Sequence, residues 1–320
     1  MSESLAICTL FEGDYHYGVG SLVNSLYASG FRGVVWAGYR GSLPRWATPL
    51  VGEGPYTEYQ VADGCVIRFL LVETSAHLTN YKPDFMLSLF EHHARDCQGL
   101  FYLDPDIVVC EPWSSFGEWI CCGVAVCEDV NSPFAAQHPR RVGWRNFFAQ
   151  QGIQLQPNEP FYANGGFVGV RREDIAFLKL WKRLQDHLWD ALGGADYVGI
   201  GGGKSVASSS GFAGCFDKTD QDVLNATVEA VEGISVSFEN KQAMGFAPGK
   251  TMLPHALGPG KPWLRRYILE ALGGLPPRPV DKEYWRNAEG PIRPFSAKQL
   301  RGKRIALKIA AALGRFIRRN

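Results

Sequence analysis

The chain has 320 residues, of which 46% are hydrophobic, 20% are charged and 12% are aromatic, and its formal net charge is +1. This length allows one large α/β domain or two smaller ones, and this composition excludes global disorder. A net charge near zero excludes a general electrostatic attraction to nucleic acid or membranes, so any basic surface must come from local clustering.

The cysteine pattern and the N-terminus indicate a cytoplasmic protein. The eight cysteines include no C-x-x-C pair and no zinc-finger spacing, and most stand in apolar stretches, which favours buried, reduced thiols. The first four residues lack the basic and apolar regions of a signal peptide. No window of about 18 residues is apolar enough to predict a membrane span.

The first forty residues predict a β-α-β unit. Residues 5–10 form a short apolar run typical of a strand, and a polar and aromatic loop follows at 11–17. Apolar residues then recur at helical spacing over 19–27, Gly30 is placed to end that helix, and 34–36 predict a second strand. This order is typical of a parallel sheet with helices on its faces.

The chain continues this α/β pattern to residue 272. Strands are predicted at 66–72, 100–103, 123–126 and 166–170, and helices at 83–97, 175–192 and 220–231. Residues 193–214 are rich in Gly and Ser, which predicts a mobile loop. We therefore expect an α/β fold with a mixed, mostly parallel sheet flanked by helices over 1–272, followed by a Pro-rich linker and basic tail at 273–320.

Two carboxylates follow the buried strand predicted at 100–103. Asp104 and Asp106 stand one residue apart, where that strand ends. Ligands of open α/β sheets bind at this edge, and paired carboxylates suit a hard divalent cation such as Mg²⁺ or Mn²⁺. Such a cation could neutralise a diphosphate, although a D-x-D pair is also compatible with a simple polar turn.

A second motif, H-x-x-G-x-x-K-P-W, covers residues 255–263. His255 is a competent third ligand for a Mn²⁺-like metal. Gly258 permits close approach of the backbone to a phosphate, and Lys261 supplies a positive charge for phosphate oxygens. His255 taken alone could be an ordinary core or surface histidine, but the spacing and the residue types together favour a binding site.

Two further polar segments stand beside predicted elements. Asp220, Gln221 and Asp222 begin the helix predicted at 220–231, and Asn164 lies in a Gly-rich turn before the strand predicted at 166–170. Either segment could serve only as a helix cap or a turn.

Taken in chain order, these four elements resemble glycosyltransferase family 8. The D-x-D pair, N-x-G before a strand, D-Q-D and H-x-x-G-x-x-K-P-W follow one another as in that family, and the last and most specific element is intact. The resemblance covers about residues 5–270. It implies the Rossmann-like GT-A fold of nucleotide-diphospho-sugar transferases and a retaining transfer of a hexose from a UDP-sugar, with Mn²⁺ or Mg²⁺, to a glycan or lipid-linked glycan acceptor.

The same resemblance implies a role for each matching residue. Asp104, Asp106 and His255 would bind the metal, while Asn164, Asp220 and Gln221 would lie at the reacting carbon of the donor sugar as catalytic residues. The donor-binding residues would be Thr9, Leu10, Tyr15 or Tyr17, Lys82, Asp104, Asp106, Asp222, Gly258 and Lys261, with the residues from 9 to 17 around the uridine. Residues 11–17 follow the family pattern only loosely, which leaves the choice between Tyr15 and Tyr17 open. Residues 199–211 have the character of an insertion, either an acceptor loop or a linker.

The chemistry of such a transfer concerns charge on the leaving group. Negative charge grows on the diphosphate as the glycosidic bond breaks, and the metal and Lys261 would stabilise it. Retention could come from a covalent carboxylate intermediate or from attack on the same face. Gln221 is a poor nucleophile, which favours same-face attack.

The C-terminal residues 298–319 hold eight basic residues and no acid. On a helical wheel, Ile305, Ile309, Leu313 and Phe316 share one face, and Arg304, Lys308, Arg315 and Arg319 share another. This is typical of an interfacial helix on anionic lipid, although an ordinary helix packed on the domain has the same pattern. No aromatic residues alternate with the charges, so we expect no nucleic-acid partner and instead a cytoplasmic protein peripheral to the inner face of the membrane.

Two other functions remain open. Residues 104–108 also match the D-x-D-x-[TV] motif of haloacid-dehalogenase-type phosphatases, with Asp104 as nucleophile. That family carries the motif on its first strand, whereas about a hundred residues precede it here. The second alternative is a non-catalytic scaffold that binds glycan or membrane, and the complete set of metal ligands argues against it.

Overall fold

The computed structural model describes residues 4–47, 54–192 and 215–317. It divides into two compact units, each assembled from separate stretches of chain. The first unit takes residues 1–10, 72–103 and 116–241, and the second takes 11–71, 104–115 and 242–320. The loop expected at 193–214, its insertion at 199–211, and Arg319 of the tail lie outside the described residues.

Five strands that the structure describes lie wholly or, for β1, mainly in the first unit, in the order β1-β5-β7-β6-β8. Their bounds are Leu5–Glu12 (β1), Gly99–Leu103 (β5), Ala163–Arg171 (β7), Val124–Glu128 (β6) and Val236–Glu239 (β8). β1 is parallel to β5, and β6 is parallel to β8, whereas β7 runs antiparallel to both of its neighbours. Every residue of β5 is buried, as expected of a strand in the centre of a sheet, and Asp104 follows it directly in the chain.

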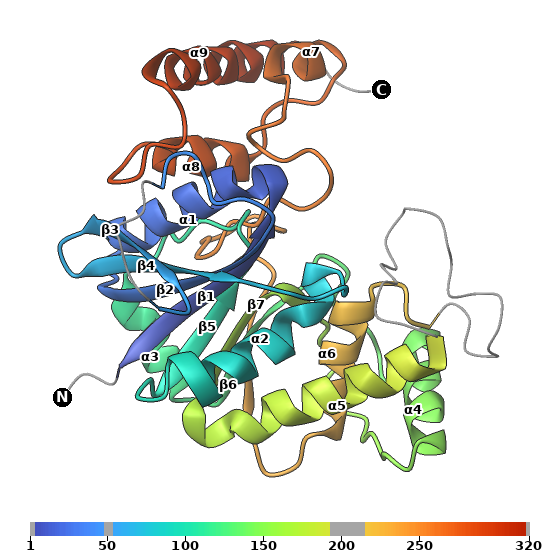
Figure 1. Ribbon diagram of the computed structural model, residues 1–320. Helices are drawn as coiled ribbons and strands as arrows, with labels where there is room; N and C mark the ends of the chain where they lie inside the picture. The colour runs from blue at the N-terminus through green and yellow to red at the C-terminus, as the bar shows by residue number, and fades with distance from the viewer. Residues whose placement is uncertain (1–3, 48–53, 193–214, 318–320) are drawn as a thin grey trace. The chain divides into compact units, whose positions relative to one another are not determined.

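The helices of this part of the chain are α2 (Lys82–Ser88), α3 (Trp113–Ile120), α4 (Pro139–Gln150), α5 (Ile175–Leu192) and α6 (Thr219–Ala230). α5 packs against both α2 and α6 (Figure 1). Its buried residues Phe177, Trp181, Leu184 and Leu188 recur three or four positions apart, so one apolar stripe faces the core.

The second unit holds the strand order β3-β4-β2, with bounds Thr57–Ala62 (β3), Cys65–Leu71 (β4) and Gly33–Arg40 (β2). β2 is parallel to β4, and β3 is antiparallel to β4. Its helices are α1 (His16–Ala28), α7 (Tyr267–Leu272), α8 (Pro279–Asn287) and α9 (Ala297–Leu313). Gly30 follows α1 at φ +92°, a conformation that glycine adopts without strain, and so ends the helix as expected.

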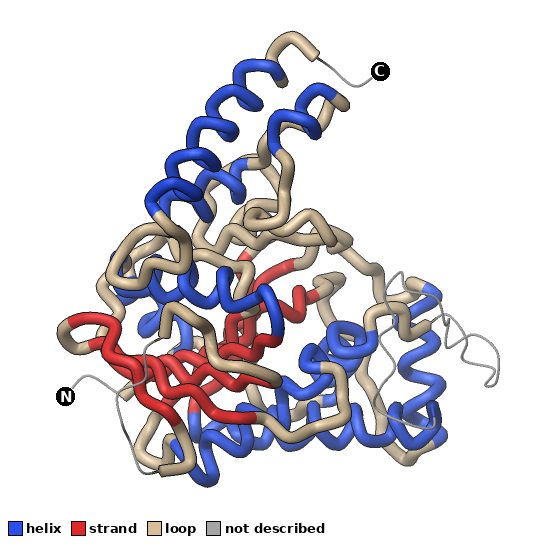
Figure 2. Tube along the Cα trace, turned by 45° about the horizontal axis from the view of Figure 1, so that its top comes forward, coloured by secondary structure: helices blue, strands red, loops and turns tan. Residues whose placement is uncertain are grey.

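An aromatic cluster joins the C-terminal helices of the second unit. α8 packs on α1, and α9 packs on α7 and α8 (Figure 1); the pair α7 and α9 is seen again in Figure 2. Buried members of the cluster include Trp263, Tyr267, Tyr284, Trp285 and Leu300. The separation of a linker and tail from residue 273 stays a prediction, and α8 and α9 contribute to this buried cluster.

The expected α/β architecture, with a mixed and mostly parallel sheet flanked by helices, is confirmed. The helix expected at 83–97 is shorter, because a π-helical turn at Leu89–His93 follows α2. The expected loop at 11–17 is replaced by the end of β1, a 3₁₀ turn at Gly13–Tyr15 and the start of α1. The sequence did not predict β3, β8, α3, α4, α7 or α8.

All eight cysteines are free, as expected. Five of them are buried, but Cys110, Cys121 and Cys122 are exposed, so the expectation of burial is wrong for Cys110 within its apolar stretch. In the described ranges, no helix has both the length and the apolar character needed to cross a membrane.

Candidate functional site

The first candidate cluster lies in the second unit and contains Asp104, Asp106 and His255. A short antiparallel bridge pairs Ile107 with His255, and the N–H of Ala256 donates to the carbonyl of Asp106 at 3.1 Å. The backbone thus places His255 beside the two aspartates, as the sequence predicts. Asp106 and His255 are buried, and Asp104 is partly exposed.

These three side chains fit a single divalent cation. Each offers one ligand atom, and these atoms all lie within 4.8 Å of one another. His255 Nε2 is 3.3 Å from Asp106 Oδ1 and 3.7 Å from Asp104 Oδ2. Neighbouring ligand atoms around an octahedral ion with bonds of about 2.1 Å lie about 3 Å apart, so small side-chain movements would complete the site. Two carboxylate oxygens and one imidazole nitrogen suit Mn²⁺ better than Mg²⁺, which takes mainly oxygen ligands.

Lys261 lies against this cluster. Its Nζ is 2.5 Å from Asp106 Oδ2 and donates to the carbonyl of Ala256 at 3.0 Å. Burial raises the pKa of Asp106, but the neighbouring His255 and Lys261 outweigh burial and hold that pKa well below its usual range. Burial lowers the pKa of Lys261, but Asp106 and Tyr15 raise it overall. The pair therefore stays charged at neutral pH, with an ammonium group held where a phosphate oxygen could bind.

The structure separates the two tyrosines that the sequence left open. The Tyr15 ring lies 5.7 Å from Lys261 Nζ and packs edge-on against Trp263, so Tyr15 belongs to the surroundings of this cluster. Tyr17 stacks on Phe295 at 4.7 Å and packs against the aromatic cluster of the C-terminal helices. Tyr15 is therefore the better candidate for contact with a ligand.

Gly258 lies in the exposed turn between His255 and Lys261. Its φ is +81°, and no atom lies within 4 Å of an added Cβ, so backbone conformation rather than crowding requires glycine there.

A second candidate cluster lies in the first unit around Lys82. The Lys82 side chain is buried, and its Nζ donates to the carbonyl of Gly165 at 2.7 Å and to Asp220 Oδ2 at 2.9 Å. A Cβ on Gly165 would lie 3.1 Å from the same Asp220 oxygen, so the strand β7 and the start of α6 meet closely. This contact brings together Lys82, the Gly-rich turn at Gly165 and the start of α6 at Asp220, which the sequence placed in one site.

Gln221 and Asn164 occupy the same cluster. Gln221 Oε1 accepts from the N–H of Gly165 at 3.0 Å, while its Nε2 is buried and has no hydrogen-bond partner among the described residues. Asn164 donates through Nδ2 to Asp129 Oδ2 at 2.7 Å. A buried amide N–H₂ without a partner costs free energy, which a ligand hydroxyl would recover.

Asp129 is a member of this cluster that the sequence analysis missed. It is completely buried, accepts from Asn164, and lies 3.8 Å from Lys218 Nζ. The available signal was its position directly after the strand β6, where a carboxylate reaches the same edge of a sheet.

Asp222 and the β1 residues make mainly internal contacts. Asp222 is completely buried and accepts from the Tyr162 hydroxyl at 2.7 Å and from the Lys218 N–H at 2.8 Å. Thr9 and Leu10 are both buried in β1, and Thr9 Oγ1 has no hydrogen-bond partner among the described residues. Their expected contacts with the donor stay predictions.

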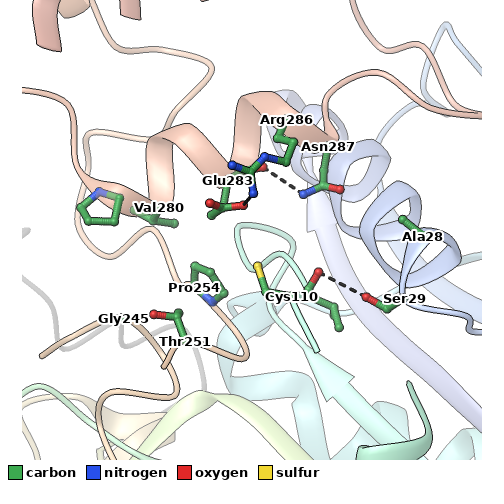
Figure 3. A pocket seen from close by; sticks show the side chains of 12 residues that line it. Ala28, Ser29, Cys110, Gly245, Thr251, Pro254, Val280, Glu283, Arg286 and Asn287 are labelled. Carbon is green, nitrogen blue, oxygen red and sulfur yellow. Dashed lines mark hydrogen bonds and ion pairs between the residues drawn. The ribbon is translucent and has the colours of Figure 1, made fainter. Parts of the chain in front are cut away.

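A pocket of about 370 Å³ lies in the second unit beside α8. Figure 3 shows Cys110 and Pro254 on one side of it and Glu283 of α8 on the other. The chain segments that carry Asp106 and His255 continue into its wall, but neither residue lines it. The pocket is therefore separate from the three-ligand cluster.

The architecture is that of the GT-A fold, the fold of one large class of glycosyltransferases. Two crystal structures of the galactosyltransferase LgtC share it, one in complex with donor and acceptor sugar analogues and one of a Gln-to-Glu active-site mutant. Their TM-scores are 0.51 and 0.50 at 17% identity, and each alignment covers 93% of this chain and 99% of LgtC. The apo structure of the bifunctional glycosyltransferase WbbM aligns at a TM-score of 0.47 and 14% identity, over 90% of this chain and 52% of WbbM, and supports no argument at that distance.

No family model matches this chain, and no curated protein is detectably similar to it in sequence. The likeness to LgtC therefore establishes the fold, and the residues of the two clusters indicate the function.

Proposed function

We propose that this protein is a metal-dependent, retaining glycosyltransferase that moves a hexose from a UDP-sugar to a glycan or lipid-linked glycan. The observation that carries the proposal is the meeting of Asp104, Asp106 and His255 beside Lys261, in a chain with the fold of LgtC. LgtC was crystallised with donor and acceptor sugar analogues, which supports a sugar donor and a sugar acceptor here.

Charge explains what the first cluster would contribute. Bound to Asp104, Asp106 and His255, Mn²⁺ (or Mg²⁺) would supply a Lewis acid for the departing diphosphate. Lys261 is held as an ammonium and would donate to a phosphate oxygen, and Gly258 would let the backbone approach the same group.

The cluster in the first unit would act on the sugar. The unpartnered Nε2 of Gln221 would donate to a sugar oxygen, while Lys82 and Asn164 hold the carboxylates of Asp220 and Asp129 in place. An amide at position 221 stabilises an oxocarbenium-like carbon through its oxygen but is a poor nucleophile, so we favour attack from the same face.

The two alternatives have less support. A phosphatase with Asp104 as nucleophile would leave His255 and Lys261 without a role, and the fold is shared with a galactosyltransferase. A non-catalytic scaffold would not need a three-ligand set, two members of which are buried, with a charged lysine beside it.

We also propose that α9 and α7 form a surface for anionic lipid. Ile305 and Ile309 of α9 and Phe316 just beyond it are exposed, and Arg301, Lys308 and Arg315, seven residues apart, follow one side of this apolar stripe. Two members of the expected pattern differ, because Leu313 packs against the aromatic cluster and Arg304 pairs with Glu289 at 2.7 Å. α7 adds exposed Ile268, Leu269 and Leu272, which the sequence analysis did not foresee.

The lipid surface is tested by sedimentation with vesicles. The protein should pellet with vesicles containing anionic lipid and much less with neutral ones, because each basic residue near the surface contributes about 1 kcal/mol. An Ile305→Glu, Ile309→Glu double variant should lose this binding. Equal pelleting of the variant and the parent protein would contradict the proposal.

The transferase activity is tested by UDP release from a panel of UDP-sugars, because slow donor hydrolysis requires no known acceptor. We expect release from one UDP-sugar with Mn²⁺, loss of release with EDTA, and loss in an Asp106→Asn variant. The matched control is Asp96→Asn, since Asp96 is an exposed aspartate outside both clusters. Absence of release from every UDP-sugar, together with no thermal stabilisation by UDP and Mn²⁺, would refute the UDP-sugar donor.

A further inference from the structure

Arg278 stands in the Pro-rich segment before α8, yet its guanidinium contacts the turn that carries Gly258. Nη1 donates to the carbonyl of Leu257 at 2.9 Å, and Nη2 donates to the carbonyl of Gly260 at 2.8 Å. The planar fork of arginine suits two such acceptors at once. One side chain thus fixes both ends of the Gly258–Pro259 turn.

A buried carboxylate holds Arg278 in this position. Asp281 is completely buried and accepts from Arg278 Nη2 at 3.1 Å, from Arg278 Nε at 3.2 Å and from the Arg278 N–H at 2.8 Å. The same carboxylate pairs with Arg265, which is itself buried. A buried charge with this many partners keeps one geometry, because breaking any of these contacts leaves charge uncompensated.

A residue of α9, Lys303, contacts the part of the chain that follows Lys261. Lys303 Nζ donates to the carbonyl of Arg265 at 2.8 Å and to that of Trp263 at 3.3 Å. The residues on both sides of Lys261 are therefore fixed from the C-terminal helices.

The geometry of the peptide bond sets the direction in which the Gly258 N–H points. In a trans peptide the C=O and the following N–H point in opposite directions. Because the carbonyl of Leu257 points toward Arg278, the N–H of Gly258 points away from it, and among the described residues this N–H has no hydrogen-bond partner. The N–H is thereby left available as a donor for an anion, in a turn whose next residues carry Lys261, and the Lys261 ammonium reaches back to the carbonyl of Ala256.

We infer that Arg278 is a positioning residue for the diphosphate of the donor, and that it acts by orienting the turn at Gly258 rather than by touching the ligand. The inference rests on the proposed function, in which Gly258 and Lys261 bind that diphosphate. It gives the segment before α8 a part in donor binding.

The test is calorimetric titration of the full chain with Mn²⁺ alone, with pyrophosphate plus Mn²⁺ and with UDP plus Mn²⁺. Arg278→Lys and Arg278→Ala are compared with Arg286→Ala, a control within α8 whose side chain is 72% exposed and pairs with Glu283. We expect both Arg278 variants to bind pyrophosphate and UDP about tenfold more weakly or worse, with Mn²⁺ affinity within about twofold of the parent protein. The control should match the parent protein.

The Arg278→Lys variant distinguishes a positioning role of Arg278 from a contribution to stability alone. A lysine can still pair with Asp281 as a point charge, but it cannot reach both carbonyls, so thermal stability should be kept while diphosphate affinity falls. Parent-like pyrophosphate affinity in Arg278→Lys would overturn the inference, and so would a parallel loss of Mn²⁺ affinity. If the parent protein binds pyrophosphate but not UDP, the proposed donor is wrong, and the Arg278 variants still decide the positioning role.

Discussion

Replacing Lys82 with methionine would leave the Asp220 carboxylate without its cation in the interior of the first unit. The Lys82 side chain is 1% exposed and that of Asp220 10% exposed, and the two groups are 2.9 Å apart. Removing one partner of a buried pair costs about 3–5 kcal/mol, because the remaining charge cannot be solvated. The change also removes a hydrogen bond to the Gly165 carbonyl.

We expect the melting temperature of Lys82→Met to fall by about 6–10 °C in scanning calorimetry, at roughly 2 °C per kcal/mol for a chain of this size. Adding Asp220→Asn should restore part of the loss, since no uncompensated charge then remains. The matched control is Lys182→Met. Lys182 pairs with Asp84 at 3.0 Å and Asp186 at 2.9 Å on the surface, and such pairs contribute about 0–1 kcal/mol.

Two results would refute this reasoning. If Lys82→Met and Lys182→Met lost the same stability, burial would not determine the value of the pair. If the double variant were less stable than Lys82→Met, the isolated Asp220 carboxylate would not be the source of the cost.

Two further predictions concern pH and close packing. Burial, which outweighs the effect of Arg140, raises the pKa of Asp222 to about 6 in the folded protein, against about 3.9 in an unfolded chain. The folded state therefore holds this proton to a higher pH than the unfolded state, and it should lose about 3 kcal/mol of stability as pH rises from about 4 to about 6. Asp222→Asn should abolish this decline in melting temperature, and an unchanged decline would show that other groups cause it. A Cβ at Gly18 would lie 2.2 Å from the carbonyl oxygen of Pro105, which stands between Asp104 and Asp106 in the chain, so Gly18→Ala should weaken Mn²⁺ binding in calorimetric titration by about tenfold or more. Gly302→Ala, with open space around it in α9, should bind Mn²⁺ normally and gain about 0.5–1 kcal/mol of stability; normal Mn²⁺ binding by both would contradict the packing argument.

The three candidate metal ligands were predictable because their signals are local. Two aspartates directly after a buried strand, and a histidine, glycine and lysine at fixed spacing, each show in a short stretch of sequence. The choice between Tyr15 and Tyr17 was not predictable, because the stacking partner of Tyr17 is Phe295, far along the chain. Asp129 was missed although it directly follows β6, because its contact with Asn164 joins residues far apart in the sequence.

In the fold too, elements with a local sequence signal could be predicted and elements without one could not. Long apolar strands and the 18-residue helix α5 were found because their periodicity identifies them. β3 was missed because its residues are mostly half-buried and polar, and α8 because prolines around Arg278 suggested a linker. Pro279 in fact occupies the first turn of α8, with Asp281 completing a capping box, and a first-turn proline is favourable in helices.

The discontinuous second unit fixes the order in which its parts become available during synthesis. It takes residues from 11–71, 104–115 and 242–320, so Asp104 and Asp106 emerge from the ribosome long before His255. Its aromatic cluster also needs Leu300 and Ala310, which come later still. The first unit, in contrast, has all its residues by position 241. A growing chain can therefore fold the first unit while the three candidate ligands are still separated, and the complete set forms only after His255 has been made.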